Sequence, residues 1–185
     1  EEFKMFRRVV EASGRPMVFT CNQRHDGRGT FWKDLMAFAR EARDDGHILR
    51  PVVAPRPIGV MLGLNGSQNP FSGTRTYRSI EHLPLDQRVE AMSQPDIRAK
   101  ILSEDPVKQS TFPLIHRILF TQMFRLGSPA NYTPSPEESI SAMAQNLGVT
   151  PQEMAYDILL ENQGREFIYA PLVNYANYTM DACAE

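Results

Sequence analysis

Side chains that could bind a ligand follow the predicted strands of this sequence, at the positions where α/β folds place their binding sites. A neutral amide can orient a substrate, a guanidinium can bind a carboxylate, and a thiolate can ligate a metal or attack an electrophile. The pattern predicts a substrate-binding edge and assigns no catalytic residue. The residues concerned are Cys21, Asn22, Gln23, Arg50, Arg56, Asn174 and Tyr175.

Some of these residues have ordinary alternatives. Cys21 has no paired histidine, so it is either a metal ligand or nucleophile, or a small buried apolar residue. Arg50 and Arg56 flank the central strand. A guanidinium there either binds the carboxylate of an acyl amino acid or forms a surface ion pair. Both alternatives stay open at the level of sequence.

The histidines show no spacing typical of a metal site. No two of them stand at i, i+2 or i, i+4, the spacings that put two ligands on one side of a strand or helix. Each is expected to be solvated or locally hydrogen-bonded. The sequence also lacks the G-x-S-x-G motif of a serine hydrolase. The four histidines are His25, His47, His82 and His116.

A strand, a helix and a second strand position the first of the candidate residues. Residues 15–22 form a short apolar strand, and Thr30 can cap a helix that ends at 44–46. The next strand lies within the most sustained apolar run, 47–64. Units of this kind pair in parallel with a right-handed crossover, so the predicted class is α/β.

The run 47–64 is predicted to be a strand that ends in a ligand-binding loop. Its valines and isoleucines favour a strand buried on both faces. Because proline donates no backbone hydrogen bond, regular pairing is expected only around Val52 and Val53. From Pro55 onward we expect irregular backbone.

The alternation of strands and helices breaks down after Leu64. Residues 65–73 are predicted to be a long loop, either functional or mobile, and 65–135 a helical insertion. Helices are expected at 86–93 and from Pro95, whereas 112–126 fits a strand and a helix equally well.

The later part of the chain is more regular. Ser135 to Glu138 and Thr150 to Glu153 are both capping boxes with proline at the first helical position, so each predicts a helix. A third strand is predicted at 166–171, its loop at 172–177 and a final helix at 178–185.

The composition is that of an ordinary globular domain. The 185 residues are 42% apolar and 23% charged, with a net charge of -2. This balance gives no support for nucleic-acid binding, and no apolar run is long enough to cross a bilayer. We expect one domain over residues 1–185, a cytoplasmic location, and reduced thiols at Cys21 and Cys183.

The chain is expected to be a piece of a larger protein. Both ends fall inside predicted helices, and only three strands are predicted, whereas a complete (β/α)8 barrel needs eight. The expected fold is therefore a partial (β/α)8 barrel with a helical excursion, helix-rich as an isolated chain.

Several landmarks, taken in order, resemble the middle and later part of the N-acyl-D-amino-acid deacylases of the amidohydrolase superfamily. The resemblance covers nearly the whole chain. It implies a metallo-dependent hydrolase barrel that holds zinc, and an activated water that attacks the amide of an N-acyl-D-amino acid. The landmarks are residues 14–20, 50–64, Pro70-Phe71, 83–85, Arg88, 155–160 and 174–176.

The sequence departs from the family pattern at the positions that would supply the zinc ligands. The family's His-x-His motif and its late catalytic aspartate have no counterpart in this chain. Where the family has a metal-binding histidine at the end of the strand at 17–22, the resemblance implies either that Cys21 takes its place or that the ligand has been lost. By itself the chain is therefore expected to bind no zinc and to be inactive. The alternative is a non-catalytic interaction module, completed by a partner chain or as a homodimer through open strand edges.

Overall fold

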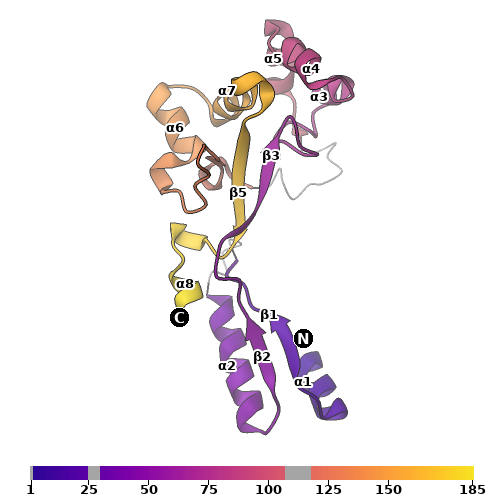
Figure 1. Ribbon diagram of the computed structural model, residues 1–185, viewed down its shortest axis with the longest axis vertical. Coiled ribbons are helices and arrows are strands. Elements are labelled where there is room, and N and C mark those ends of the chain that lie inside the picture. Colours follow the sequence, from indigo (N-terminus) through magenta and orange to yellow (C-terminus); the bar gives the residue numbers. More distant parts are fainter. Residues whose placement is uncertain (1, 25–29, 107–117) are drawn as a thin grey trace. The chain divides into compact units, whose positions relative to one another are not determined.

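The structure is a computed structural model that describes residues 2–24, 30–106 and 118–185 (Figure 1). The fold divides into two compact units, whereas the sequence predicts one domain. The first unit comprises Glu1–Ile58 and Leu172–Glu185, and the second comprises Gly59–Pro171.

The first unit is built around a parallel pair of strands. Strand β1 (Met17–Thr20) pairs with β2 (Leu49–Val52), and helix α2 (Phe31–Asp44) connects them. This confirms the predicted parallel strand, helix, strand unit. Thr30 is the N-cap residue of α2, as expected, but its side chain makes no capping hydrogen bond.

Two helices bury one face of this pair. Phe19 and Leu49 lie in one apolar cluster with Leu35, Ala39 and Ala42 of α2. Helix α1 (Glu2–Ser13) adds Val10 to the same cluster. Helix α1 ends before Gly14, whose φ of 62° favours glycine.

The other face of the pair is exposed. Alternation along the strands puts Val18, Ile48 and Val52 on this face, and their side chains are 64%, 43% and 52% exposed. Strand β2 is therefore buried on one face only, and the prediction of burial on both faces is wrong. Parallel sheets are normally covered on both faces, so the exposure of these apolar side chains is unusual.

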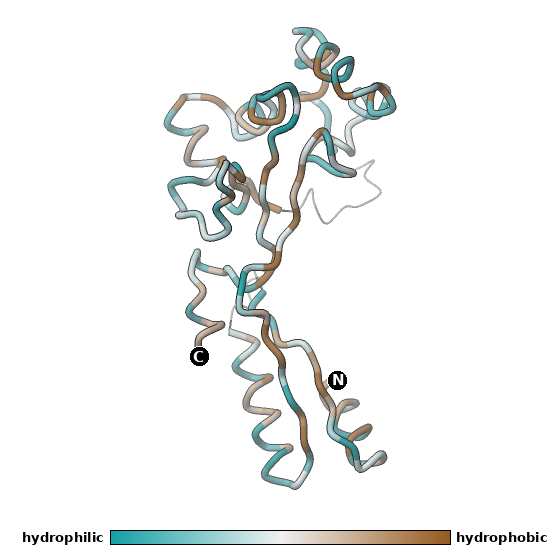
Figure 2. The backbone as a smooth tube through the Cα atoms, viewed as in Figure 1, coloured by the Kyte–Doolittle hydropathy of each residue, from teal (hydrophilic) through white to brown (hydrophobic). Residues whose placement is uncertain are grey.

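The apolar run 47–64 contains two strands, not one strand and a loop. After the prolines at 55 and 57, a new strand β3 (Ile58–Gly63) begins, and apolar residues follow one another along it (Figure 2). The expected irregular backbone is limited to the few residues between β2 and β3. Regular pairing of β2 includes Pro51 and ends at Val52, before these prolines. The chain beyond them pairs with a strand from far along the sequence.

That distant partner is β5 (Phe167–Val173), the third predicted strand, extended by two residues into the predicted loop. It lies between β3 and β4 (Phe124–Arg125) and runs antiparallel to β4. Gly59 lies against Ala170, and Gly63 lies against Phe167, so β3 and β5 also run in opposite directions.

Helices surround this sheet in the second unit. The predicted helices near 86–93 and from Pro95 are confirmed, and both capping boxes are present, at Ser135 and Thr150. The helices are α3 (Arg75–Ile80), α4 (Leu85–Met92), α5 (Pro95–Ser103), α6 (Ile140–Leu147), α7 (Pro151–Gly164), and the 3-10 turns η3 (Phe120–Gln122) and η4 (Pro136–Glu138).

The predicted final helix needs correction, and the ambiguous stretch 112–126 lies partly outside the described residues. The final helix reduces to the 3-10 turn η5 (Ala176–Tyr178) and α8 (Asp181–Ala184). Of the ambiguous stretch 112–126, residues up to 117 lie outside the described ranges, and the rest forms η3 and the short β4. No helix among the described residues is both long and apolar enough to span a membrane.

The predicted loop at 65–73 is an ordered part of the core. Asn69 is 1% exposed, and its Oδ1 accepts a hydrogen bond from the backbone N of Phe71 at 2.9 Å. Phe71 packs edge-on against Tyr156 of α7. Arg88 donates to the carbonyl oxygens of Leu64 and Leu83, each at 2.8 Å. These contacts explain why a stretch of turn formers holds one conformation.

The carboxylate of Glu104, the residue directly after α5, binds the start of α3. Glu104 accepts hydrogen bonds from the backbone N of Thr76 at 2.9 Å and from its hydroxyl at 2.5 Å. Burial alone would raise the pKa of Glu104, but the hydrogen bonds from Thr76 and from the backbone of Arg75 outweigh it and lower that pKa. The ionised carboxylate is therefore the form that stabilises the second unit.

This lowered pKa predicts an acid-sensitive contribution to stability. A carboxylate with a depressed folded-state pKa stabilises the fold above its unfolded pKa of about 4.3 and loses that contribution as the pH falls through the lower folded value. We expect the free energy of unfolding of Glu104→Gln to fall less steeply with acidification below about pH 4.3 than that of the parent. Urea unfolding at a series of pH values measures this, and parallel curves would contradict it.

Candidate functional site

Asn174 joins the two chain segments of the first unit, Glu1–Ile58 and Leu172–Glu185, by side-chain hydrogen bonds. It is 0% exposed and has a φ of 65°, in the left-handed region that asparagine tolerates. Its Oδ1 accepts from the backbone N of Gln23 at 2.9 Å, and its Nδ2 donates to the carbonyl of Ala54 at 3.2 Å and, more weakly, to Asn22 Oδ1 at 3.5 Å. Asn174 thereby joins the segments that follow β1, β2 and β5.

Gln23 completes a reciprocal pair with Asn174. Its carbonyl accepts from the backbone N of Asn174 at 2.8 Å, and its side-chain Oε1 accepts from the backbone N of Ala176 at 3.1 Å. The side chain is 8% exposed. Its Nε2 group donates to no residue in the described part of the chain, so this group is the donor left for a ligand.

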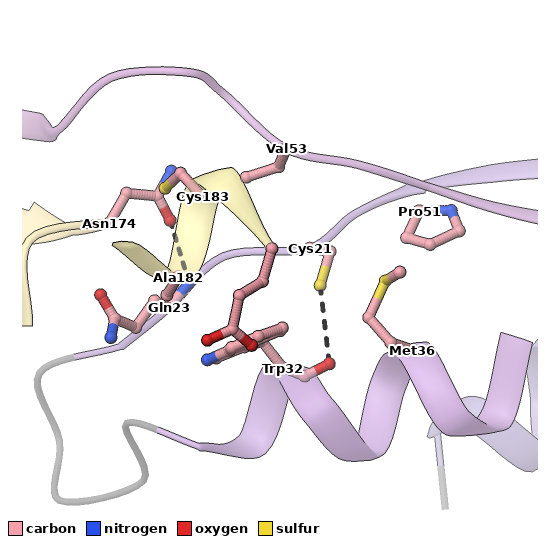
Figure 3. Close-up of a pocket in the computed structure, with 10 residues that line it drawn as sticks. Cys21, Gln23, Trp32, Met36, Pro51, Val53, Asn174, Ala182 and Cys183 are labelled. Carbon is pink, nitrogen blue, oxygen red and sulfur yellow. Dashed lines mark hydrogen bonds between the residues drawn. The ribbon is translucent and has the colours of Figure 1, made fainter. Parts of the chain in front are cut away.

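A pocket of about 210 Å³ lies beside this pair (Figure 3). It is bounded by the ends of β1 and β2, by α2 and by the α8 segment, all within the first unit. Apolar side chains and two cysteines make up most of its wall. The lining residues are Cys21, Gln23, Trp32, Met36, Pro51, Val53, Asn174, Ala182, Cys183 and Glu185.

Cys21 lines this pocket as a thiol. It is 5% exposed, and its Sγ points to the carbonyl of Trp32 at 4.0 Å (Figure 3). Burial, with a smaller effect from Cys183, raises the pKa of Cys21, whereas a metal ligand requires the thiolate. Within residues 2–24, 30–106 and 118–185, no three His, Cys, Asp or Glu side chains gather in the way a metal ion requires. The described residues therefore do not fit a zinc centre.

The two arginines lie apart from the pocket lining. Arg50 is exposed on the open face of the strand pair, opposite Val18 in the register and away from Cys21. Arg56 is exposed just after β2, two residues beyond Ala54, whose carbonyl binds Asn174. Neither guanidinium pairs with a carboxylate in the described ranges, so the surface ion pair that the sequence left open is not formed there.

His47, His82 and Tyr175 do not line the pocket. Tyr175 is 3% exposed and packs edge-on against Tyr178. His47 lies 3.7 Å from the carboxylate of Glu11, and His82 is exposed. His25 and His116 lie outside the described residues.

The structure thus brings together Asn22, Gln23 and Asn174, and adds Cys21 through the pocket. Sequence reasoning missed the pocket wall. Trp32 and Met36 belong to the apolar face of a predicted helix, a pattern that does not separate core residues from pocket residues. Cys183 comes from a distant segment, so no sequence spacing could have linked it to Cys21.

Known proteins offer no further guide to this site. Comparison of the chain with protein-family models, with curated proteins and with solved structures gave no match in any of the three.

Proposed function

We propose that this chain is a substrate-orienting segment of an amidohydrolase of the N-acyl-D-amino-acid deacylase type, and that it is inactive alone. The observation that carries the proposal is the reciprocal pair of Gln23 and Asn174 beside a pocket at the carboxyl end of β1. The parallel unit of β1, α2 and β2 supports it too, because such units repeat in (β/α)8 barrels.

In this proposal the amide pair orients the scissile amide of the substrate. Asn174 uses its side-chain groups within the fold, so it fixes the position of Gln23 and the chain around it. Gln23 Nε2 then donates to the carbonyl oxygen of an N-acyl group. A metal would supply an activated water in the complete enzyme. Its ligands would come from outside the described residues.

Arg56 is the better candidate for binding the substrate carboxylate. It follows the same strand end that Asn174 binds through Ala54, whereas Arg50 lies on the opposite face from Cys21. A guanidinium that pairs with no carboxylate among the described residues is available for a bidentate contact to a substrate carboxylate. The two arginines therefore form a matched pair for a test, because Arg56→Gln and Arg50→Gln remove the same charge.

The proposal predicts selective binding without turnover. We expect the parent chain to bind an N-acyl-D-amino acid more tightly than its L enantiomer in isothermal titration calorimetry. Gln23→Glu replaces the Nε2 donor but keeps an acceptor for Ala176, and it should weaken binding about tenfold. Arg56→Gln should weaken it by a similar factor, and Arg50→Gln should leave it unchanged.

Two results would refute this function. One is equal affinity for both enantiomers in all variants, since no oriented site would then exist. The other concerns the claim of inactivity: steady hydrolysis by the isolated chain with added zinc, in proportion to protein concentration, would show that the chain carries its own catalytic centre.

The exposed apolar face of β1 and β2 favours a second candidate, an interaction module completed by self-association or a partner chain. A two-stranded parallel sheet has two open edges, and Val18, Ile48 and Val52 lie on its uncovered face. We expect sedimentation velocity at micromolar concentration to show a homodimer that Val18→Lys disrupts. A monomer with one sharp unfolding transition would argue against a sheet completed by another chain.

A further inference from the structure

We propose that the pocket lined by Trp32, Met36 and Val53, here called the Trp32 pocket, receives the acyl chain of an N-acyl amino acid. This inference rests on the proposed function and deepens it, because it assigns the part of the substrate that determines specificity. It also assigns a direction of binding, with the acyl chain inside the pocket and the carboxylate outside.

The chemistry of the wall supports an apolar occupant. Trp32, Met36, Val53 and Pro51 contribute hydrocarbon, aromatic and thioether surface, and the thiols of Cys21 and Cys183 add soft, weakly polar surface. Burial raises the pKa of both thiols, so they stay protonated and neutral near pH 7. Burying a chain of methylene groups against such a wall is favourable.

Desolvation of the carboxylate sets the direction of binding. Among the described lining residues only Glu185 carries a formal charge, and Lys33 offsets it by pairing with its carboxylate at 3.4 Å. A substrate carboxylate entering the pocket would lose its hydration and gain no cationic partner from the described lining residues. The neutral acyl end enters at lower cost, and the amide then lies at the end of the pocket that Gln23 and Asn174 form.

The size of the pocket limits the acyl group. A dry apolar cavity of about 150 Å³ binds benzene in a well-studied case. At about 210 Å³ the Trp32 pocket is somewhat larger, so it fits a benzoyl group or an aliphatic chain of similar bulk. An acetyl group would leave most of the pocket empty, and a palmitoyl chain would extend far beyond it.

The pocket carries its own reporter, because Trp32 is the single tryptophan of the chain. We expect an N-benzoyl-D-amino acid to change Trp32 fluorescence in a saturable way and to bind at least about tenfold more tightly than the N-acetyl compound. It should also slow alkylation of Cys183 by iodoacetamide, a measurement that needs no variant.

A matched pair of variants on α8 tests the location. Ala182 lines the pocket, and Ala184 is exposed on the same helix and does not. Ala182→Phe should fill the pocket and weaken benzoyl binding at least about tenfold, whereas Ala184→Phe should leave it unchanged. If Ala182→Phe does not fold, protection of Cys183 in the parent chain still decides the matter.

The outcomes separate this inference from the proposed function. Equal affinity for acetyl and benzoyl compounds, with Gln23→Glu still weakening both, would overturn the acyl pocket and leave the proposed function standing. Fluorescence changes with benzene but with no N-acyl amino acid would overturn both. Tighter binding of an alkylammonium ion than of the benzoyl compound would also overturn the inference, since Glu185 would then determine the ligand.

Discussion

Replacing Asn174 by alanine should lower the free energy of unfolding of the first unit by about 3 kcal/mol or more. The substitution leaves the backbone N of Gln23 and the carbonyl of Ala54 without their side-chain partner, and each buried unsatisfied group costs about 1–3 kcal/mol. Alanine is also less tolerant than asparagine of the φ of 65° at this position. Urea unfolding followed by Trp32 fluorescence measures the loss, because Trp32 lies in the same unit.

Asn177→Ala is the matched control for this experiment. Asn177 has a φ of 63°, close to that of Asn174, but its side chain is exposed. The two variants therefore share the backbone strain and differ in the buried hydrogen bonds. Equal losses would mean that the bonds of Asn174 contribute nothing measurable, and the connection that positions Gln23 would have to be abandoned.

Adding one methyl group at Gly59 should destabilise the second unit by about 2–3 kcal/mol, the usual cost of overpacking a rigid site. A Cβ at this position would lie 2.5 Å from the carbonyl oxygen of Ala170 and 2.8 Å from the Cα of Pro171. These are backbone atoms of β5, so relief requires β3 and β5 to move apart. Faster amide hydrogen exchange at Leu62 and Ile168 would locate the effect in these strands.

Gly66→Ala is the control, because its added Cβ would lie 3.4 Å from the nearest atom, the carbonyl oxygen of Gly63. We expect this variant to lose less than about 1 kcal/mol when the thermal unfolding of both glycine variants is compared with that of the parent chain. If Gly59→Ala were as stable as Gly66→Ala, the result would contradict the claim that β3 and β5 lie too close at Gly59 to admit a Cβ.

Local sequence signals determined much of the secondary structure. The capping box at Thr150 begins α7 as predicted, since it uses side-chain and backbone groups within four residues. The box at Ser135 begins only the 3-10 turn η4, and α6 starts separately after its own N-cap, Ser139. The parallel pairing of β1 and β2 followed from the spacing of two apolar runs around an amphipathic helix. The caps depend on neighbours in sequence, and the pairing of two strands joined by one helix follows the general crossover rule, so both could be predicted from the sequence.

Contacts between distant segments decided the rest. The stretch after Pro55 forms a strand because β5, more than a hundred residues later, lies beside its glycines. Intrinsic strand propensity takes account of the prolines, but it does not include a partner strand that is distant in sequence. For the same reason residues 65–73 pack as an ordered turn, held by Arg88 and by Tyr156.

The candidate site divides in the same way. Residue type and position after a strand were enough to select Asn22, Gln23 and Asn174, because polar side chains at strand ends follow a general rule of α/β folds. Tertiary structure alone decided that Asn174 is a buried connector and that Arg50 lies on the other face of the strand pair. It also decided that Gln23 Nε2 donates to none of the described residues. It also formed the pocket wall from Trp32, Met36 and Cys183, since a pocket exists only where folding brings separate segments together.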